Sequence, residues 1–233
     1  GEIAGGDRQI ANIILARFSD ESPDKKVYSR MIKDILRSVQ DRGFIDYHGS
    51  NRAGDDIHKL IEQADSDVKQ GQLAKATVIY QAVVETVVPA ISHADDSNGL
   101  LGDCIEAGLH GLRTVSENLS KPEQGRLFDY CVSEAFESRY KDWDWGWALA
   151  QIAADRVTGS EERQRVFDLL DKMAARSKRS NEQSVWSSNF DAERAEVIKL
   201  SVVERLDDPD QIHGFLVDRI QMDHFREKLI ILY

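Results

Sequence analysis

The sequence predicts an all-α protein, and two observations carry this prediction. Apolar residues recur at three- and four-residue spacing through most of the 233 residues, as on one face of a helix. Helix start and stop signals separate these stretches, whereas the only short alternation typical of a strand, at residues 44–47, lies in a connector. We therefore expect a succession of helices joined by short turns, with almost no sheet.

The start and stop signals delimit about eleven helices. We expect them near residues 7–18, 23–42, 53–70, 72–93, 99–119, 122–140, 143–157, 160–177, 188–206, 208–219 and 223–232. Three of the four prolines, Pro23, Pro122 and Pro209, stand where a helix should begin, a position at which the missing N–H has no intrahelical partner to lose. The polar, serine-rich stretch 177–188 is predicted to be a flexible loop.

Local signals fix the ends of several helices. Ser22, Pro23 and Asp24 supply an N-cap, a proline at the first helical position and an acid in the first turn. Gly43 is expected to end this first well-marked helix in the left-handed conformation. Gly108 and Gly111 lie inside a helical pattern, where they indicate close packing against another helix.

A repeat is clearest between residues 60 and 89. In a tetratricopeptide register, the small residues Ala64 and Ala76 allow two helices to approach closely, and Gly71 permits the tight turn between them. Tyr80 is expected to fill the groove toward the next unit. Because a single hairpin cannot bury its own apolar face, such units must stack. This pattern predicts a right-handed α–α superhelix of tetratricopeptide-like helical hairpins.

The whole chain, residues 1–233, is accordingly expected to form one α-solenoid-like domain with a concave groove. Three of the four tryptophans stand together in the segment 142–147, and tryptophan is enriched where interfaces bind most strongly. On a helix, Trp143 and Trp147 would share a face and Trp145 would point elsewhere. The alternative is that at least two of them wedge one repeat against the next. The candidate partner-binding residues are Tyr80, Trp143, Trp145 and Trp147.

The charge balance points to a class of partner. Thirty Lys and Arg against 41 Asp and Glu give a net charge of −11. This charge disfavours binding of nucleic acid or an anionic membrane by this chain alone, and it favours a protein partner with a basic surface. No apolar run approaches the ~20 residues of a membrane span, and no signal peptide opens the chain. Two cysteines fit a reducing compartment, so we expect a cytoplasmic protein.

Sites for metals and catalysis are not expected. A calcium loop starting at Asp95 would need a glycine at its sixth position, where Leu100 stands, so the loop 93–99 is interpreted as a helix stop followed by an N-cap. Cys104 and His110 lie outside zinc-ligand spacing. Nucleophile-elbow, phosphate-loop and dinucleotide-binding motifs do not occur. The sequence thus predicts no enzyme, no cofactor and no metal.

The order of several short segments resembles the helical region that follows the zinc finger in prokaryotic SWIM zinc finger proteins. These segments cover most of residues 28–233 and lie at 43–47, 94–99, 146–149, 158–162, 206–210 and 225–230. The resemblance implies the interaction-module part of a longer protein. The zinc-binding Cys and His pattern of the family is not in this chain, so the finger and its nucleic-acid contacts would lie outside it.

These observations together predict a non-catalytic protein-interaction scaffold that binds through the concave groove. A regulatory helical domain that binds a small ligand between its helices is the alternative. A helical enzyme with an unrecognised site and a purely structural or oligomerisation role also stay open.

Overall fold

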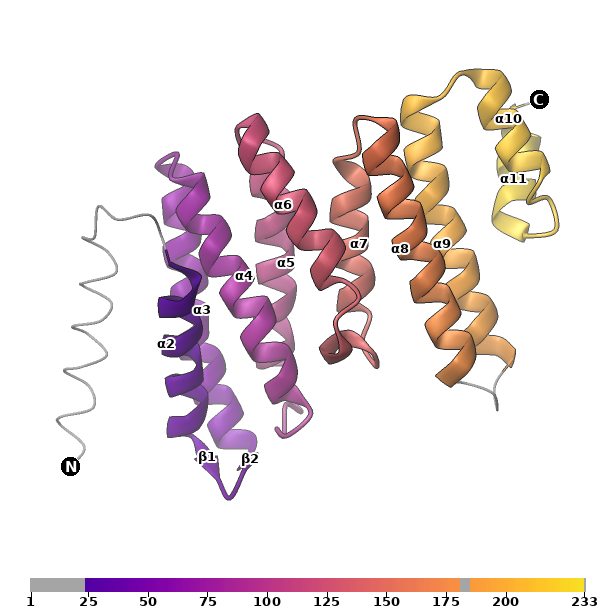
Figure 1. The fold of residues 1–233 in the computed structure, drawn as a ribbon. Coiled ribbons are helices and arrows are strands. Elements are labelled where there is room, and N and C mark those ends of the chain that lie inside the picture. Colours follow the sequence, from indigo (N-terminus) through magenta and orange to yellow (C-terminus); the bar gives the residue numbers. More distant parts are fainter. Residues whose placement is uncertain (1–23, 181–184, 233) are drawn as a thin grey trace, which may run out of the picture. The chain divides into compact units, whose positions relative to one another are not determined.

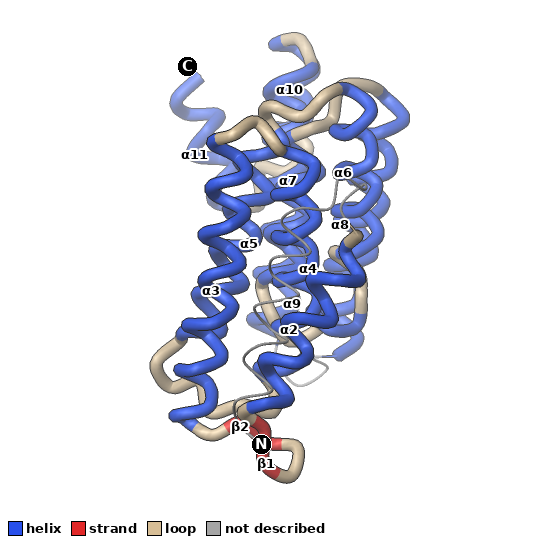
Figure 2. Tube along the Cα trace, turned by 90° about the vertical axis from the view of Figure 1, so that its left-hand side faces the viewer, coloured by secondary structure: helices blue, strands red, loops and turns tan. Residues whose placement is uncertain are grey.

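The computed structural model describes residues 24–180 and 185–232. Within these ranges the chain forms ten α-helices, one short 3₁₀ helix and one two-stranded sheet, so it is all-α as predicted. Figure 2 shows that helices account for nearly all of the described chain. Contacts divide the chain into two compact units, unit 1 (residues 1–124) and unit 2 (residues 125–233). The helix expected at 7–18 lies outside the described residues.

From residue 24 onward, unit 1 contains four long helices and a small hairpin (Figure 1). In chain order they are α2 (Lys25–Ser38), β1 (Gln40–Asp41), β2 (Phe44–Ile45), α3 (Tyr47–Lys69), α4 (Leu73–Ile91) and α5 (Leu100–Ser116). Helices α3 and α4 each contact the other three helices, and α4 does so most extensively.

The first described helix starts and stops differently from the sequence prediction. Asp24 is itself the N-cap, because its side chain accepts a hydrogen bond of 2.8 Å from the backbone N–H of Lys26. The helix ends at Ser38, before Gly43, because residues 40–45 pair as an antiparallel hairpin. Gly43, with φ of +89°, serves the turn of this hairpin and does not end the helix.

Helix α3 begins at Tyr47, six residues before its predicted start at 53, because Asp46 caps it with a 2.7 Å bond from the Gly49 N–H. The turn to α4 contains Gly71 with φ of +76°, as predicted. Ala64 and Ala76 are fully buried on the two helices of this hairpin. Both small residues therefore lie in the core of unit 1, and the tetratricopeptide-type crossing itself stays a prediction.

Helix α5 starts at the polar loop 93–99 as expected. Gly99 adopts φ of +77°, and the Asp96 carboxylate accepts bonds of 3.0 Å from the backbone N–H groups of Leu101 and Gly102. Gly108 and Gly111 pack closely on α4, because a Cβ added to them would lie 2.9 Å from Val84 and 2.5 Å from the Tyr80 ring. These two glycines confirm the predicted helix–helix approach.

One finding bears on the expectation that no apolar run could span a membrane. Among the described residues, α4 alone is long and apolar enough to do so by length and composition. In the structure, ten of its 19 residues are buried within unit 1, as in the core helix of a folded domain.

Unit 2 contains the following elements, of which the first begins just before the boundary (Figure 1). They are α6 (Lys121–Glu134), η1 (Ser138–Tyr140), α7 (Trp145–Asp155), α8 (Ser160–Ser180), α9 (Val185–Leu206), α10 (Pro209–Val217) and α11 (Asp223–Leu232). Helices α7, α8 and α9 pack on one another, and α10 packs on both α9 and α11. Asp208 and Gln211 form a capping box around Pro209 at the start of α10, where a helix start was predicted.

The loop predicted at 177–188 is occupied by helix over much of its length. Helix α8 continues to Ser180 and α9 resumes at Val185, and residues 181–184 lie outside the described residues. The predicted helix 122–140 is also interrupted, since α6 ends at Glu134 and η1 follows. This interruption positions the segment that carries three tryptophans.

Candidate binding pocket around the tryptophans

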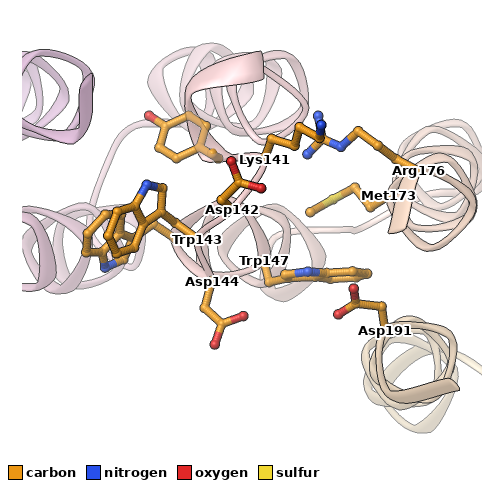
Figure 3. A pocket seen from close by; sticks show the side chains of 10 residues that line it. Lys141, Asp142, Trp143, Asp144, Trp147, Met173, Arg176 and Asp191 are labelled. Carbon is orange, nitrogen blue, oxygen red and sulfur yellow. The ribbon is translucent and has the colours of Figure 1, made fainter. Parts of the chain in front are cut away.

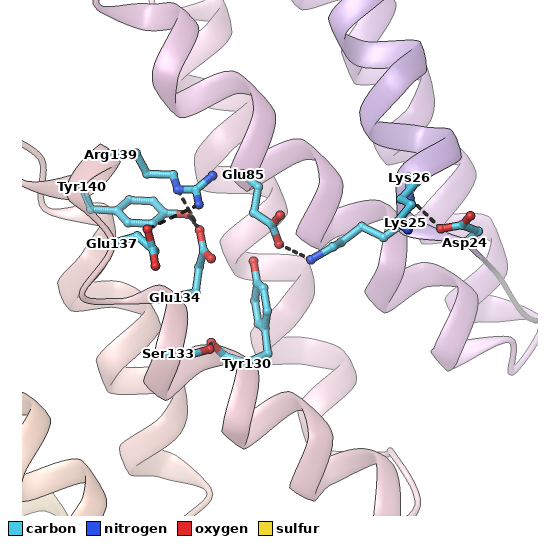
Figure 4. A network of polar contacts seen from close by, with 10 residues as sticks. All are labelled: Asp24, Lys25, Lys26, Glu85, Tyr130, Ser133, Glu134, Glu137, Arg139 and Tyr140. Atoms are coloured by element: carbon cyan, nitrogen blue, oxygen red, sulfur yellow. Dashed lines mark hydrogen bonds and ion pairs between the residues drawn. The ribbon is translucent and has the colours of Figure 1, made fainter.

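The turn after α6 is held by a buried polar contact. Tyr140 is 1% exposed, and its hydroxyl donates a 2.8 Å hydrogen bond to Glu134 Oε1 at the end of α6. The same carboxylate pairs with Arg139 Nε at 3.1 Å (Figure 4). These contacts hold the 3₁₀ turn η1 against the end of α6. They thereby set the direction in which residues 141–144 continue from η1.

A close backbone approach fixes the start of α7. A Cβ added to Gly146 would lie 2.8 Å from the carbonyl oxygen of Ala135 and 3.1 Å from Tyr140 Cβ. Only glycine allows the first turn of α7 to lie this close to the end of α6. The tryptophans on both sides of Gly146 are therefore placed by a rigid contact.

The three tryptophans are arranged differently from the prediction. Helix α7 begins at Trp145, so Trp143 lies in the preceding turn and does not share a helix face with Trp147. Instead, the Trp143 and Trp145 rings stack with centroids 4.7 Å apart and planes at 19°. Trp145 and Trp147 are 8% and 6% exposed, whereas Trp143 is 37% exposed. Trp143 is thus the most exposed of these three tryptophans.

These residues line a cavity of about 640 Å³, which we call the tryptophan pocket (Figure 3). Seven of its ten lining residues come from the segment 140–147, and the others are Met173 and Arg176 of α8 and Asp191 of α9. Figure 3 shows the Trp147 indole edge-on, with Met173 on one side of its plane and the carboxylates of Asp144 and Asp191 on the other. The pocket therefore combines aromatic and thioether surface with carboxylates.

Of the two cations that line the pocket, Lys141 and Arg176, the second is engaged within the protein. The guanidinium of Arg176 lies 4.4 Å from the centroid of Phe136 and donates a 2.9 Å bond to the Phe136 carbonyl oxygen. Burial lowers the pKa of Arg176, and the nearby charge of Asp142 opposes this effect. Arg176 thus acts as part of the wall, and Asp142 faces it.

A second guanidinium lies on the Trp147 ring. Arg194, on α9, places its Cζ 5.3 Å from the ring centroid, while its Nη1 donates a 2.6 Å bond to Asp144 Oδ1. The Arg194 side chain is 28% exposed and that of Asp144 is 80% exposed. Most of the Asp144 carboxylate therefore faces solvent although one oxygen is bonded.

The fourth residue predicted to bind a partner, Tyr80, belongs to unit 1 and is not brought into this pocket. Its ring is 1% exposed and packs against Gly111 of α5. Its hydroxyl donates a 2.6 Å bond to Asp65. Burial, followed by the hydrogen bond and charge of Asp65, raises the pKa of Tyr80. The structure gives this side chain a place in the core, where a partner at the surface would touch little of it.

Sequence reasoning singled out the tryptophans but not the charged residues that complete the pocket. Asp142 and Asp144 alternate with Trp143 and Trp145, and this alternation was a visible signal. Arg194 gave none, because it is 50 residues from Asp144 in the chain and meets it only through the packing of α9 on α7.

The cysteines of the described chain are possible metal ligands and possible nucleophiles. Among them, no group of three or more His, Cys, Asp or Glu side chains could hold a metal ion. Both cysteines are buried. Burial raises the pKa of Cys104 to about 12, and it raises the pKa of Cys131 as well, so both thiols stay protonated near neutral pH.

Comparison of the chain with protein-family models, with curated proteins and with solved structures finds no significant match. The likeness to the helical region of SWIM zinc finger proteins therefore stays a prediction that rests on the short segments of the sequence.

Proposed function

We propose that this protein is a non-catalytic interaction scaffold, and that the tryptophan pocket binds a basic segment of another protein. The observation that carries the proposal is the pocket itself, where solvent-accessible indole surface and the carboxylates of Asp142, Asp144 and Asp191 line one cavity. Aromatic faces attract cations, and carboxylates give them a hydrogen-bonding counter-ion. A lysine or arginine side chain matches both kinds of surface.

The charge of the whole chain supports the same partner. With a net charge of −11, the protein attracts a basic segment over a distance and repels acidic ones. A tryptophan such as Trp143 then supplies apolar contact area, which charged groups alone do not provide. Because its side chain has only two rotatable bonds, binding costs little side-chain conformational entropy. In this proposal, charge attracts the partner over a distance and contact with the indole rings stabilises the complex.

The finer architecture belongs to this proposal. The α3–α4 hairpin, with its buried alanines and Gly71 turn, supports tetratricopeptide-like packing of helical hairpins. We extend this to a right-handed superhelix and to the interaction region of a cytoplasmic protein of the SWIM zinc finger type. In that setting, contacts with nucleic acid would belong to the finger and contacts with protein to this chain.

A small-ligand sensor is the second candidate, and the volume of the tryptophan pocket favours it. About 640 Å³ lies within the range of small-molecule sites. Such sites are mostly apolar, however, whereas five of the ten residues lining this pocket carry a charge. The charged lining fits the side chains of a polypeptide better.

The first test measures binding of a fluorescently labelled basic peptide to wild-type protein and to Trp143→Ala by fluorescence anisotropy. Loss of an exposed interface tryptophan should weaken binding by about tenfold or more, which corresponds to about 1.4 kcal/mol. Phe44→Ala is the matched control, since Phe44 is an aromatic residue in unit 1 that is 51% exposed. It should bind like wild type.

Recovery of partners from native lysate by wild type, Trp143→Ala and Trp147→Ala extends the test to natural proteins. Unchanged peptide affinity in Trp143→Ala, or equal binding of an acidic peptide of the same length, would contradict the proposal. Tight binding of a small molecule in the pocket without any peptide binding would favour the second candidate.

A further inference from the structure

The contact of Arg194 with the tryptophan pocket indicates which cation the pocket takes. The Arg194 guanidinium is held between the Trp147 indole, 5.3 Å from its Cζ, and the Asp144 carboxylate, 2.6 Å from its Nη1. A guanidinium suits both partners, because it stacks flat on an aromatic ring and presents a fork of donors to a carboxylate. The protein thus already binds an arginine side chain at the edge of the pocket.

The carboxylate of this arrangement is open to solvent, whereas the carboxylate of a comparable arrangement elsewhere in unit 2 is enclosed, although the two arginines are about equally exposed. Arg163 has its Cζ 5.2 Å from the Phe167 centroid and its Nη1 2.7 Å from Asp207 Oδ1. The Asp207 carboxylate is only 12% exposed, but that of Asp144 is 80% exposed. A second cation can therefore reach Asp144 from solvent but has little access to Asp207.

We infer that the tryptophan pocket accepts an arginine side chain of a partner segment, and that Arg194 occupies part of this place in the free protein and is displaced on binding. This inference rests on the proposed function and names its ligand. Arginine is favoured over lysine because the ammonium of lysine is strongly hydrated and cannot stack on an indole. Arg194 then competes with the partner arginine. The apparent affinity for the partner is lower the larger the fraction of molecules in which Arg194 contacts Asp144 and Trp147.

The experiment compares two labelled peptides of equal length and charge, one with alternating arginine and glycine and one with alternating lysine and glycine. Arg194→Gln removes the internal competitor and should bind the arginine peptide about twofold to fivefold more tightly, because exposed ion pairs of this kind are weak. Wild type should prefer the arginine peptide. Asp144→Asn, an exposed and isosteric change, should reduce that preference.

Arg163→Gln is the matched control, since it removes a guanidinium from an aromatic ring and a carboxylate in the same unit but outside the pocket. It should leave affinity for both peptides unchanged. Far-UV circular dichroism establishes that each variant is folded. Arg194→Lys keeps the charge, and it should bind the arginine peptide with an affinity between those of wild type and Arg194→Gln.

Equal or weaker binding of the arginine peptide by Arg194→Gln would overturn the inference, and so would a preference for the lysine peptide. In either case, weakened binding by Trp143→Ala would still support the proposed function, so the two failures are distinguishable. Competition by free L-arginine at the same concentration as the peptide would show a site for the free amino acid, and this too would overturn the inference of a protein segment.

Discussion

Unit 1 and unit 2 are both helical and both have a buried apolar core, but unit 2 adds a set of contacts between cations and aromatic rings. In unit 1, α4 is buried by three helices, and the glycines of α5 let its backbone approach α4 until an added methyl group would overlap Tyr80. In unit 2, seven contacts of a cation with an aromatic ring join its described residues, Arg139–Tyr140, Arg163–Phe167, Arg165–Phe128, Arg176–Phe136, Arg194–Trp147, Lys199–Phe167 and Arg219–Phe215.

The difference has consequences for what each unit can do. Contacts between apolar atoms need close fit and are insensitive to salt, so unit 1 should tolerate ionic conditions but not added volume. Contacts of arginine with rings and carboxylates leave charged groups near the surface, where a partner can replace them. This is the reason why the proposed binding site lies in unit 2.

The largest expected effect is on the fit of unit 1. In Gly111→Ala, the new methyl would lie 2.5 Å from the Tyr80 ring, which is itself buried and bonded to Asp65. The ring or the helix must move, and overpacking of this kind lowers the free energy of unfolding by about 3 kcal/mol. Urea denaturation followed by far-UV circular dichroism measures it.

Gly102→Ala is the matched control on the same helix. A Cβ there meets only Asp96 Oδ2, at 3.6 Å, which is an ordinary contact. Alanine also restricts the unfolded chain, so this variant should be as stable as wild type or more stable by about 0.5 kcal/mol. If both variants lost the same stability, close packing would not be what holds unit 1 together.

The next effect concerns the most buried charge among the described residues of unit 2. Lys199 is 5% exposed, and its Nζ lies 2.5 Å from Asp171 and 2.7 Å from Glu196, which also pairs with Arg219. Glu196→Gln leaves two cations without this carboxylate, and we expect the free energy of unfolding to fall by about 2 kcal/mol. The four tryptophans all lie after residue 125, so their fluorescence during urea denaturation reports on this unit.

The same residue predicts a pH dependence. Burial raises the pKa of Glu196, but hydrogen bonds and charges from Lys199 and Arg219 outweigh it and lower this pKa below the ordinary 4.5. A lowered folded-state pKa stabilises the protein above about pH 4.5 and ceases to do so as the pH falls through the folded value. Wild type should thus lose more stability than Glu196→Gln between about pH 6 and pH 3. Parallel pH curves for the two proteins would contradict this role.

The sequence predicted the helical parts where the signal is local. Pro209 with its capping box and Gly71 at its turn depend on residues within a few positions or on backbone freedom. The packing glycines Gly108 and Gly111 were visible because they interrupt a helical pattern, although their partners on α4 are distant in the chain. The early start of α3 was missed, because its first turn carries polar residues without apolar periodicity, although Asp46 was a capping signal.

The candidate site was predictable only in part, since it is built by contacts between distant segments. The composition of 142–147 drew attention to the tryptophans, but their stacking depends on where α7 begins, and Gly146 and Tyr140 decide this through contacts with α6. The placement of Asp191 and Arg194 beside Trp147 needs the packing of α9, which no local pattern encodes.

The smallest expected effect distinguishes the contribution of an ion pair from that of a cation–ring contact at the surface of unit 2. Arg165 pairs with Asp129 at 2.8 Å and lies 5.0 Å from the centroid of Phe128, while its side chain is 42% exposed. Arg165→Gln should lower the free energy of unfolding by about 0.5 kcal/mol, because an exposed pair contributes little. Arg165→Lys keeps the ion pair but loses the flat stack on the ring, so it should recover only part of this loss of stability.

Salt at about 1 M should reduce the difference in stability between wild type and Arg165→Gln, while the loss of stability in Gly111→Ala should stay the same. Equal salt dependence of the two losses would mean that unit 1 and unit 2 are stabilised in the same way.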